Sequence, residues 1–199
     1  LIDMDHVAES NINRQVQAVG ATVGQAKGEA LRERVADIHP GCHVTLVDDF
    51  VSDTNLPALL PQPVDVLIDA CDQVHAKIAM AQWALQEQQR LVCVGAAGGK
   101  QRPERVEVAD LAEVTHDPLM ASMRQRLRKH HGAPRSGRIG IACVFSREAV
   151  LQPWDVCATD GAERDNDGSL NCHGYGSSVT VTASFGLVAA AHALQCVLR

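Results

Sequence analysis

The sequence predicts an α/β fold in which a mainly parallel sheet is flanked by helices. Short apolar runs rich in β-branched residues, such as 64–70, alternate with segments that carry apolar residues at helical spacing. The connections are short, and parallel strands need helical crossovers, so this alternation favours a parallel sheet. The chain has 199 residues, 46% hydrophobic and 21% charged, which suits one globular domain with a sizeable core.

The predicted elements follow one another along the chain. A helix is predicted at 24–39, because its apolar residues share one face and a Pro-Gly pair follows it. The other predicted segments are strands at 43–49, 64–70, 90–95, 105–110 and 139–146, and helices at 53–60, 74–85 and 118–131. A mobile loop is expected at 132–138, and a crossing segment or flexible loop at 158–175.

The C-terminal run "SVTVTASFGLVAAAHALQCVL" is mostly apolar and long enough to cross a bilayer. Polar residues interrupt it, among them Thr180, Ser184 and His192. Its Gly and Ala content suits close packing against a sheet or a partner helix. We therefore expect no membrane span.

The formal charge of −6 hides a separation of charges along the chain. No Asp or Glu occurs from Pro118 to Arg147, while this interval is rich in basic residues. We call the following six residues the basic strip: Arg124, Arg126, Arg128, Lys129, Arg135 and Arg138. The strip is either a solvated helix face with its loop or a surface for a polyanion.

Seven cysteines form no CxxC pair, and their odd number argues against a closed disulfide framework. A reducing cytoplasm fits this usage. Cys143, in the apolar run "IACVFS", is the candidate for a catalytic thiol, although free cysteine in such a strand is usually a small core residue. Cys172, beside His173 in a polar segment, is the other reactive candidate.

Acidic residues follow several predicted strands, where ligands bind in open parallel sheets. A carboxylate such as Asp3 can accept two hydrogen bonds from ribose hydroxyls. Arg14 and Lys27 suit phosphates, and Asp72 suits a magnesium ion shared with nucleotide oxygens. The alternative is that the two acids cap the next elements and that the two cations are solvated.

Three blocks of the sequence resemble the E1-like (ThiF/MoeB) superfamily of ATP-dependent adenylating enzymes, which have a Rossmann-like fold and ligase-like chemistry. The blocks are "LIDMDHVAESNINRQ", "TVGQAKGEALRERVADIHP" and "VLIDACDQ". Further blocks, "VEVADLAEVTHDPLMASMRQRLRK", "IACVFSREA" and "GSLNCHGYGSSVTVTASFG", resemble the branch that acts on threonylcarbamoyladenosine in tRNA. The resemblance implies one domain over 1–199, with a nucleotide-binding portion at 1–100 and a portion at 101–199 for substrate, tRNA and dimerisation.

The resemblance also implies roles for particular residues. Asp3 would bind the ATP ribose, Asn11 and Arg14 the phosphates, Lys27 the region of the α-phosphate, and Asp72 a Mg²⁺ ion. The catalytic set would be Arg14, Lys27 and Asp72, with the basic strip binding tRNA.

The sequence departs from the family pattern at several points. Gln73 replaces an Asn that often follows the last Asp, and Asp5 is expected to organise its turn. The first strand, glycine-rich loop and first helix of the family are missing before Leu1, together with the N–H cradle they give to phosphates. We therefore expect the isolated chain to bind ATP weakly and to be inactive.

The implied reaction is an ATP-dependent dehydration of N6-threonylcarbamoyladenosine beside the tRNA anticodon. ATP would activate the threonine carboxylate, and the ureido group would then close a ring. Implied partners are tRNA, a second copy of the chain and a cysteine desulfurase or sulfur acceptor, with no role for DNA. The alternative is an adenylyltransferase that activates a ubiquitin-like sulfur-carrier protein, and a third reading is an inactive scaffold.

Overall fold

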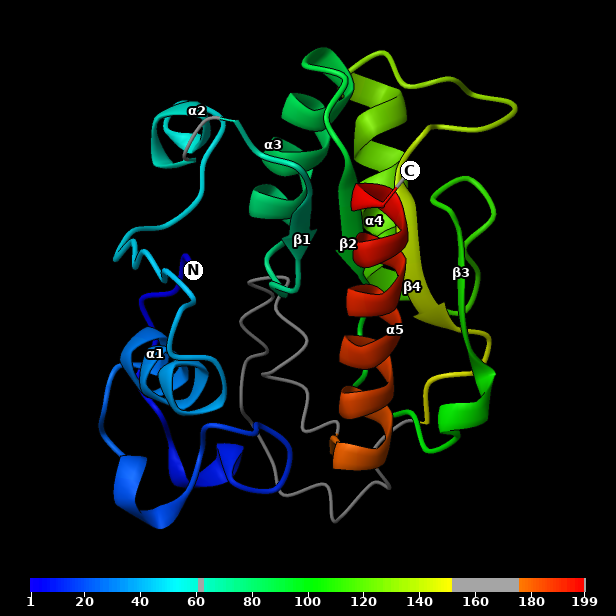
Figure 1. Ribbon diagram of the computed structural model, residues 1–199. Coiled ribbons are helices and arrows are strands. Elements are labelled where there is room, and N and C mark those ends of the chain that lie inside the picture. The colour runs from blue at the N-terminus through cyan, green and yellow to red at the C-terminus, as the bar shows by residue number, and fades with distance from the viewer. Residues whose placement is uncertain (61–62, 152–175, 199) are drawn as a thin grey trace, which may run out of the picture.

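A computed structural model describes residues 1–60, 63–151 and 176–198 (Figure 1). Its centre is a four-stranded sheet in the order β1-β2-β4-β3. Strands β1, β2 and β4 are parallel, and β3 pairs antiparallel with β4. Their bounds are β1 Leu67–Asp69, β2 Leu91–Val94, β3 Val106–Asp110 and β4 Ala142–Ser146. The predicted α/β fold with a mainly parallel sheet is confirmed.

Helices cover both faces of this sheet. Helices α3 (Val74–Gln86) and α4 (Pro118–His130) pack on one face, and α5 (Val179–Val197) packs on the other (Figure 1). Alternate residues of each strand point to opposite faces. In β2, Cys93 belongs to the cluster with α3 and α4, whereas Val92 belongs to the cluster with α5.

The N-terminal portion lies beside β1 and carries the remaining helices of the described residues (Figure 1). They are α1 Lys27–Ile38, α2 Leu56–Leu59 and the 3₁₀ turns η1 Glu9–Asn11 and η2 Gly20–Thr22, while a third such turn, η3 Pro103–Arg105, precedes β3. The strand predicted at 43–49 is reduced to one parallel bridge, between Ile2 and Val47. Two backbone bonds flank this bridge, Val47 N–H to Leu1 O and Asp3 N–H to Val47 O. The segment therefore pairs with a partner too short to form a strand.

Helix α5 packs on the sheet through a narrow stripe and exposes the rest of its apolar surface. The buried stripe consists of Val181, Phe185, Ala189 and Ala193, each one turn after the last. Leu187 and Leu194 are 72% and 62% exposed. In the part of the chain that is described, this is the one helix long and apolar enough to cross a membrane, and its packing on the sheet confirms the predicted contact.

Candidate functional site at the carboxyl edge of the sheet

The carboxyl ends of β1, β2 and β4 meet at one edge of the sheet, which we call the carboxyl edge. Asp69 ends β1, Gly95 follows β2, and Glu148 lies two residues beyond β4. Ligands bind at this edge in open α/β sheets. The opposite edge, where β4 begins, is closed by Asp110, whose carboxylate accepts hydrogen bonds from the N–H groups of Ile139 and Gly140.

Two acids and a lysine of the N-terminal portion form one group. Residues 5–7 pair antiparallel with residues 24–27, through the bridge between His6 and Ala26. This pairing puts Lys27, the first residue of α1, beside Asp5, with 2.6 Å between Nζ and Oδ2. Asp3 organises the turn, because its Oδ1 accepts from Asp5 N–H at 2.8 Å. The role expected for Asp5 was therefore wrong: Asp5 pairs with Lys27.

Asn11 and Arg14 lie in and just after the turn η1, and this part of the chain contacts the first turn of α5. Asn11 is buried, and its Oδ1 accepts from Ala8 N–H at 3.0 Å. The Arg14 guanidinium donates to Ser10 O at 2.5 Å, and Arg14 O accepts from the Thr182 hydroxyl at 3.4 Å. The N-terminal portion and α5 are thus joined close to both residues.

A buried ion pair lies directly at the carboxyl edge. Lys77 Nζ is 3.0 Å from Asp69 Oδ2, and both side chains have no exposed surface. Nζ also donates to Val94 O at 2.8 Å, and Asp69 accepts from the Cys93 thiol at 2.7 Å. Burial by itself lowers the pKa of Lys77, but the adjacent Asp69 carboxylate reverses this and raises the pKa, so the lysine is charged.

Lys77 was missed in the sequence, although a signal for it was present. It lies on the same face of the predicted helix 74–85 as Val74 and Ala81, where an uncompensated charge is costly. Asp69, at the end of the preceding strand, was the available partner. A lysine on an apolar helix face that follows a strand ending in an acid therefore indicates a buried pair.

Asp117 joins the loop after β2 to the start of α4. Its Oδ1 accepts from Met120 N–H at 3.0 Å as the N-cap of α4, and its Oδ2 accepts from Ala96 N–H at 2.8 Å. Gly95 makes this approach feasible, because a Cβ there would lie 2.3 Å from Asp117 Oδ2. A second buried cation, Lys100, donates to the carbonyl oxygens of His116 and Glu148.

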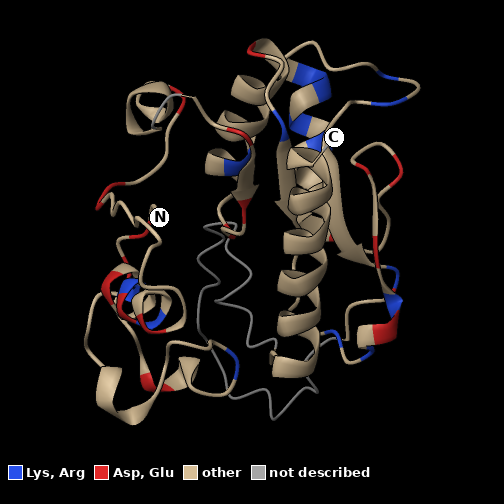
Figure 2. Ribbon diagram, in the orientation of Figure 1, with Lys and Arg blue, Asp and Glu red and all other residues tan. Residues whose placement is uncertain are grey.

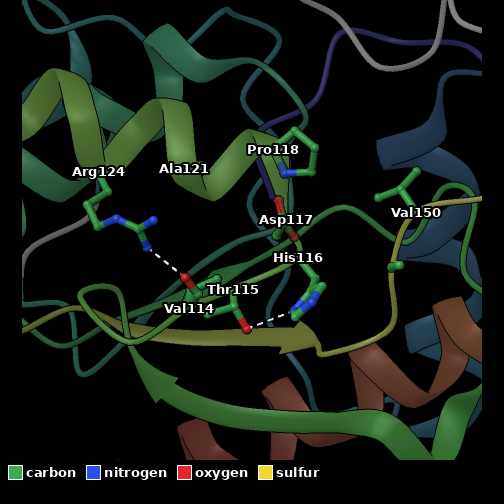
Figure 3. Close-up of a pocket in the computed structure, with 9 residues that line it drawn as sticks. Val114, Thr115, His116, Asp117, Pro118, Ala121, Arg124 and Val150 are labelled. Atoms are coloured by element: carbon green, nitrogen blue, oxygen red, sulfur yellow. Dashed lines mark hydrogen bonds between the residues drawn. The ribbon is translucent and has the colours of Figure 1, made fainter.

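A cavity of about 350 Å³ opens beside this N-cap, between the start of α4 and the residues after β4 (Figure 3). It is lined by Val114, Thr115, His116, Asp117, Pro118, Ala121, Arg124, Ala149 and Val150. His116 has a φ of 58°, in the left-handed region that residues other than glycine rarely adopt. Arg124 donates to Leu111 O and Val114 O at 3.0 and 2.7 Å, so its guanidinium holds the chain that enters α4.

The basic strip extends away from the carboxyl edge (Figure 2). Helix α4 begins at this edge and is 13 residues long. At about 1.5 Å per residue, its last turn lies roughly 20 Å away. That turn carries Arg128 and Lys129, and the following loop returns to the start of β4. Arg126, Lys129, Arg135 and Arg138 are exposed, whereas Arg124 is half-buried in the contacts described above.

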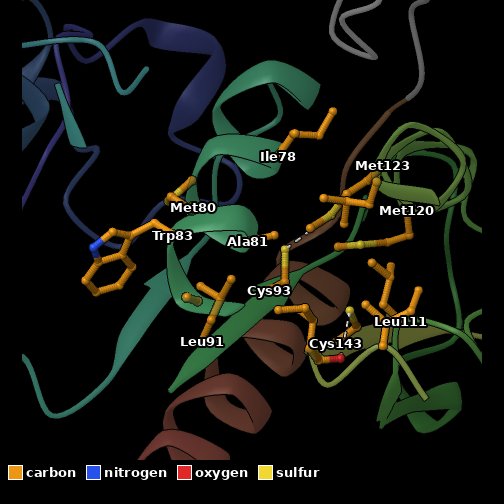
Figure 4. Close-up of a cluster of buried hydrophobic side chains, with 14 of the residues drawn as sticks. Ile78, Met80, Ala81, Trp83, Leu91, Cys93, Leu111, Met120, Met123 and Cys143 are labelled. Carbon is orange, nitrogen blue, oxygen red and sulfur yellow. Dashed lines mark hydrogen bonds between the residues drawn. The ribbon is translucent and has the colours of Figure 1, made fainter. Parts of the chain in front are cut away.

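Cys93 and Cys143 are core residues, while Cys71 is partly buried beside the core (Figure 4 shows the first two). Cys143 has no exposed surface, and its thiol lies 3.7 Å from Ile141 O. Burial raises the pKa of the Cys93 thiol well above its usual value, and burial and Asp69 raise that of Cys71 to about 12. These two thiols are neutral at physiological pH, and the burial of Cys143 speaks against a catalytic role. Cys172 and His173 lie outside the described residues.

Asp72 lies between β1 and α3 and is half-buried. Among the described residues, no group of three or more His, Cys, Asp or Glu side chains could hold a metal ion by itself. A single carboxylate at the carboxyl edge fits Mg²⁺, which commonly binds through one or two carboxylates and substrate phosphates.

Open α/β sheets of this kind bind ligands, nucleotides among them, beyond the carboxyl ends of their strands. The model of the ThiF family matches residues 1–199, and the chain belongs to this family. It is 40% identical over 201 residues to the tRNA threonylcarbamoyladenosine dehydratase of Escherichia coli (strain K12), covering 98% of this chain and 75% of that protein.

Solved structures agree with this similarity. The chain matches E. coli tRNA N6-threonylcarbamoyladenosine dehydratase, TcdA, in complex with ATP with a TM-score of 0.86 at 38% identity, covering 100% of this chain and 74% of that one. The AMP complex of the same protein matches with a TM-score of 0.87 and the same identity and coverage. A shorter match, 38% identical over 77 residues, joins 39% of the chain to 30% of the E. coli molybdopterin-synthase adenylyltransferase.

Proposed function

We propose that this protein is an ATP-dependent tRNA threonylcarbamoyladenosine dehydratase. The single observation that carries the proposal is the similarity to the E. coli dehydratase, which extends over 98% of the chain and includes a fold match to the ATP-bound protein. The acids and cations of the N-terminal portion, together with Asp72 after β1, support it, because ATP needs both ribose and phosphate partners.

The proposed reaction has two steps. The threonine carboxylate of the modified adenosine attacks the α-phosphate of ATP, which forms a mixed anhydride with AMP and releases pyrophosphate. The ureido group of the same side chain then attacks the activated carbonyl, the bond to AMP breaks, and a proton is released. The net change in the nucleoside is the loss of one water molecule. Because both reacting groups belong to one substrate, the ring closure is intramolecular and its entropic cost is low.

We assign the ATP contacts to five residues. Asp3 is exposed beside the bridge of Ile2 and can accept hydrogen bonds from the ribose hydroxyls. Asn11 and Arg14 serve the phosphates from the turn beside α5, and Lys27 stabilises the charge that develops on the α-phosphate. Asp72 would hold Mg²⁺, whose positive charge offsets phosphate charge when it is bound.

The experiment that tests this function is mass spectrometry of tRNA nucleosides. The full-length protein is incubated with ATP, Mg²⁺ and tRNA that carries threonylcarbamoyladenosine. The expected product is lighter than the substrate nucleoside by the mass of one water molecule, and it forms only with ATP. Unchanged tRNA, with ATP consumed only after a sulfur-carrier protein is added, would favour the adenylyltransferase alternative, to which the shorter match points.

The exposed part of the basic strip is proposed as a tRNA surface remote from the reaction. Replacing Arg126, Lys129 and Arg135 together by Glu is expected to raise the KM for tRNA at least tenfold and to leave kcat within about twofold, because phosphate contacts supply affinity. Steady-state kinetics at two salt concentrations measure this, and the effect should shrink at high salt. The matched control reverses Arg32 and Arg34, which are exposed on α1. An equal rise in KM for the control would contradict the assignment.

The exposed face of α5 is proposed as the contact between two copies of the chain. Exposed leucines on one helix form an apolar surface of the kind that marks protein interfaces. Replacing Leu187 and Leu194 by Lys is expected to shift the mass in solution from two chains to one, measured by light scattering. A single-chain mass for the unchanged protein would refute this contact.

We place the protein in the cytoplasm, where its tRNA substrate is found. A cysteine desulfurase or sulfur-acceptor partner stays a prediction, and no step of the proposed reaction needs it.

A further inference from the structure

The Lys77 side chain is bonded to the residue that precedes the segment carrying Asp72. Its Nζ pairs with the carboxylate of Asp69 at 3.0 Å. Lys77 itself lies in the first turn of α3, directly after this segment, and its backbone N–H makes the usual helical hydrogen bond to Gln73 O at 3.1 Å. The segment between these contacts is the connection from β1 to α3, and Asp72 is its only acidic residue.

The carboxylate of Asp69 also contacts the backbone of the turn itself. Its Oδ1 accepts from Cys71 N–H at 3.1 Å, one residue before Asp72, while its Oδ2 is occupied by Lys77 and the Cys93 thiol. Lys77 also donates to Val94 O, the last residue of β2. The lysine therefore fixes the turn relative to two neighbouring strands of the carboxyl edge.

A buried ion pair usually contributes little to the stability of a fold, because well-packed apolar residues of similar volume are often equally or more stabilising. The pair instead provides fixed geometry, since a carboxylate with both oxygens occupied cannot rotate. The pair lies at the carboxyl edge, directly before the proposed metal ligand, where a rigid backbone can orient that ligand.

We propose that Lys77 is a positioning residue, which acts through Asp69 to hold Asp72 where it binds the metal of the Mg²⁺–ATP complex. The inference rests on the proposed function for the choice of ATP and Mg²⁺. It does not depend on tRNA, so it can be tested by nucleotide binding alone.

The test measures two quantities for each variant: the stability of the fold, and the factor by which Mg²⁺ strengthens ATP binding. The double variant Asp69→Asn/Lys77→Met removes both charges, and ATP affinity is measured by calorimetry in the full-length protein with Mg²⁺ and with EDTA. The ratio of the two affinities is the readout. We expect the unfolding midpoint of the double variant to recover relative to Lys77→Met alone, while the ratio falls about tenfold, as is typical for partners of metal ligands.

The matched control is Asp110→Asn, at the opposite edge of the sheet. Asp110 is also a buried carboxylate that accepts backbone hydrogen bonds, so its loss should lower stability and leave the Mg²⁺ ratio unchanged. If the double variant does not fold, Asp69→Asn/Lys77→Gln, which also removes both charges, takes its place, with the same expected fall in the ratio.

The outcomes separate the two proposals. The positioning role would be overturned if the affinity ratio of the double variant is within twofold of that of the unchanged protein. It would also be overturned if the ratio of Asp110→Asn falls as much as that of the double variant. An unchanged protein whose ATP affinity does not respond to Mg²⁺ would overturn it too. Normal Mg²⁺-dependent ATP binding without any change in tRNA would refute the dehydratase function while the positioning role is still decided by the ratio.

Discussion

Replacing Lys27 by alanine is expected to lower kcat for tRNA dehydration by about 10²–10³-fold, the usual effect of removing one preorganised contact to developing charge. Its side chain is 14% exposed and is held 2.6 Å from Asp5, so the ammonium is positioned before ATP arrives. Such a fixed cation needs no reorganisation during the reaction.

The same substitution should change stability little. Asp5 is 68% exposed, so it regains water when its partner is removed. Exposed ion pairs contribute about 0–1 kcal/mol. The measurement is single-turnover kinetics of the nucleoside change, together with a thermal unfolding curve.

Two control variants make this result specific to Lys27. Arg32→Ala removes another cation of α1, whose partner is Glu29, and should leave kcat within twofold. Lys27→Arg keeps the charge and should retain part of the activity. An activity of Lys27→Ala equal to that of Arg32→Ala would remove Lys27 from the site.

Replacing Gly95 by alanine is expected to cause the largest loss of stability. The new Cβ would lie 2.3 Å from Asp117 Oδ2 and 3.2 Å from Val144 O, so the carboxylate of Asp117 must move. Its movement would weaken the N-cap of α4 and the bond from Ala96 N–H. A lost cap costs about 0.5–2 kcal/mol, and overpacking costs about 1–3 kcal/mol. We therefore expect a loss of about 2–4 kcal/mol in the free energy of unfolding.

Urea unfolding measures this loss as a lower midpoint. Gly186→Ala is the matched control, because a Cβ at this position of α5 meets nothing within 4 Å and alanine favours helix. The control should be neutral or slightly stabilising. Shortening the cap with Asp117→Ser should restore part of the stability of Gly95→Ala, and a Gly95→Ala midpoint equal to that of the unchanged protein would contradict the crowding argument.

The positions of helices and strands around the sheet were largely predictable, because they depend on local patterns. The apolar run at 64–70 and the helical spacing at 74–85 contain β1 and match α3. The strand predicted at 43–49 failed for a reason that no local pattern contains, since a strand needs a partner of sufficient length.

The candidate site also has features that depend on single residues and features that depend on contacts between distant residues. The sequence by itself determined which residue types suit ATP, namely the acids Asp3 and Asp72 and the cations Arg14 and Lys27, because charge and hydrogen-bonding capacity are properties of single residues. Only the tertiary structure decided their partners. It paired Lys27 with Asp5, buried Lys77 against Asp69, and placed Arg124 on backbone carbonyls, away from the exposed part of the basic strip. Contacts between residues far apart in sequence depend on how strands and helices pack, and that packing is a property of the folded chain as a whole.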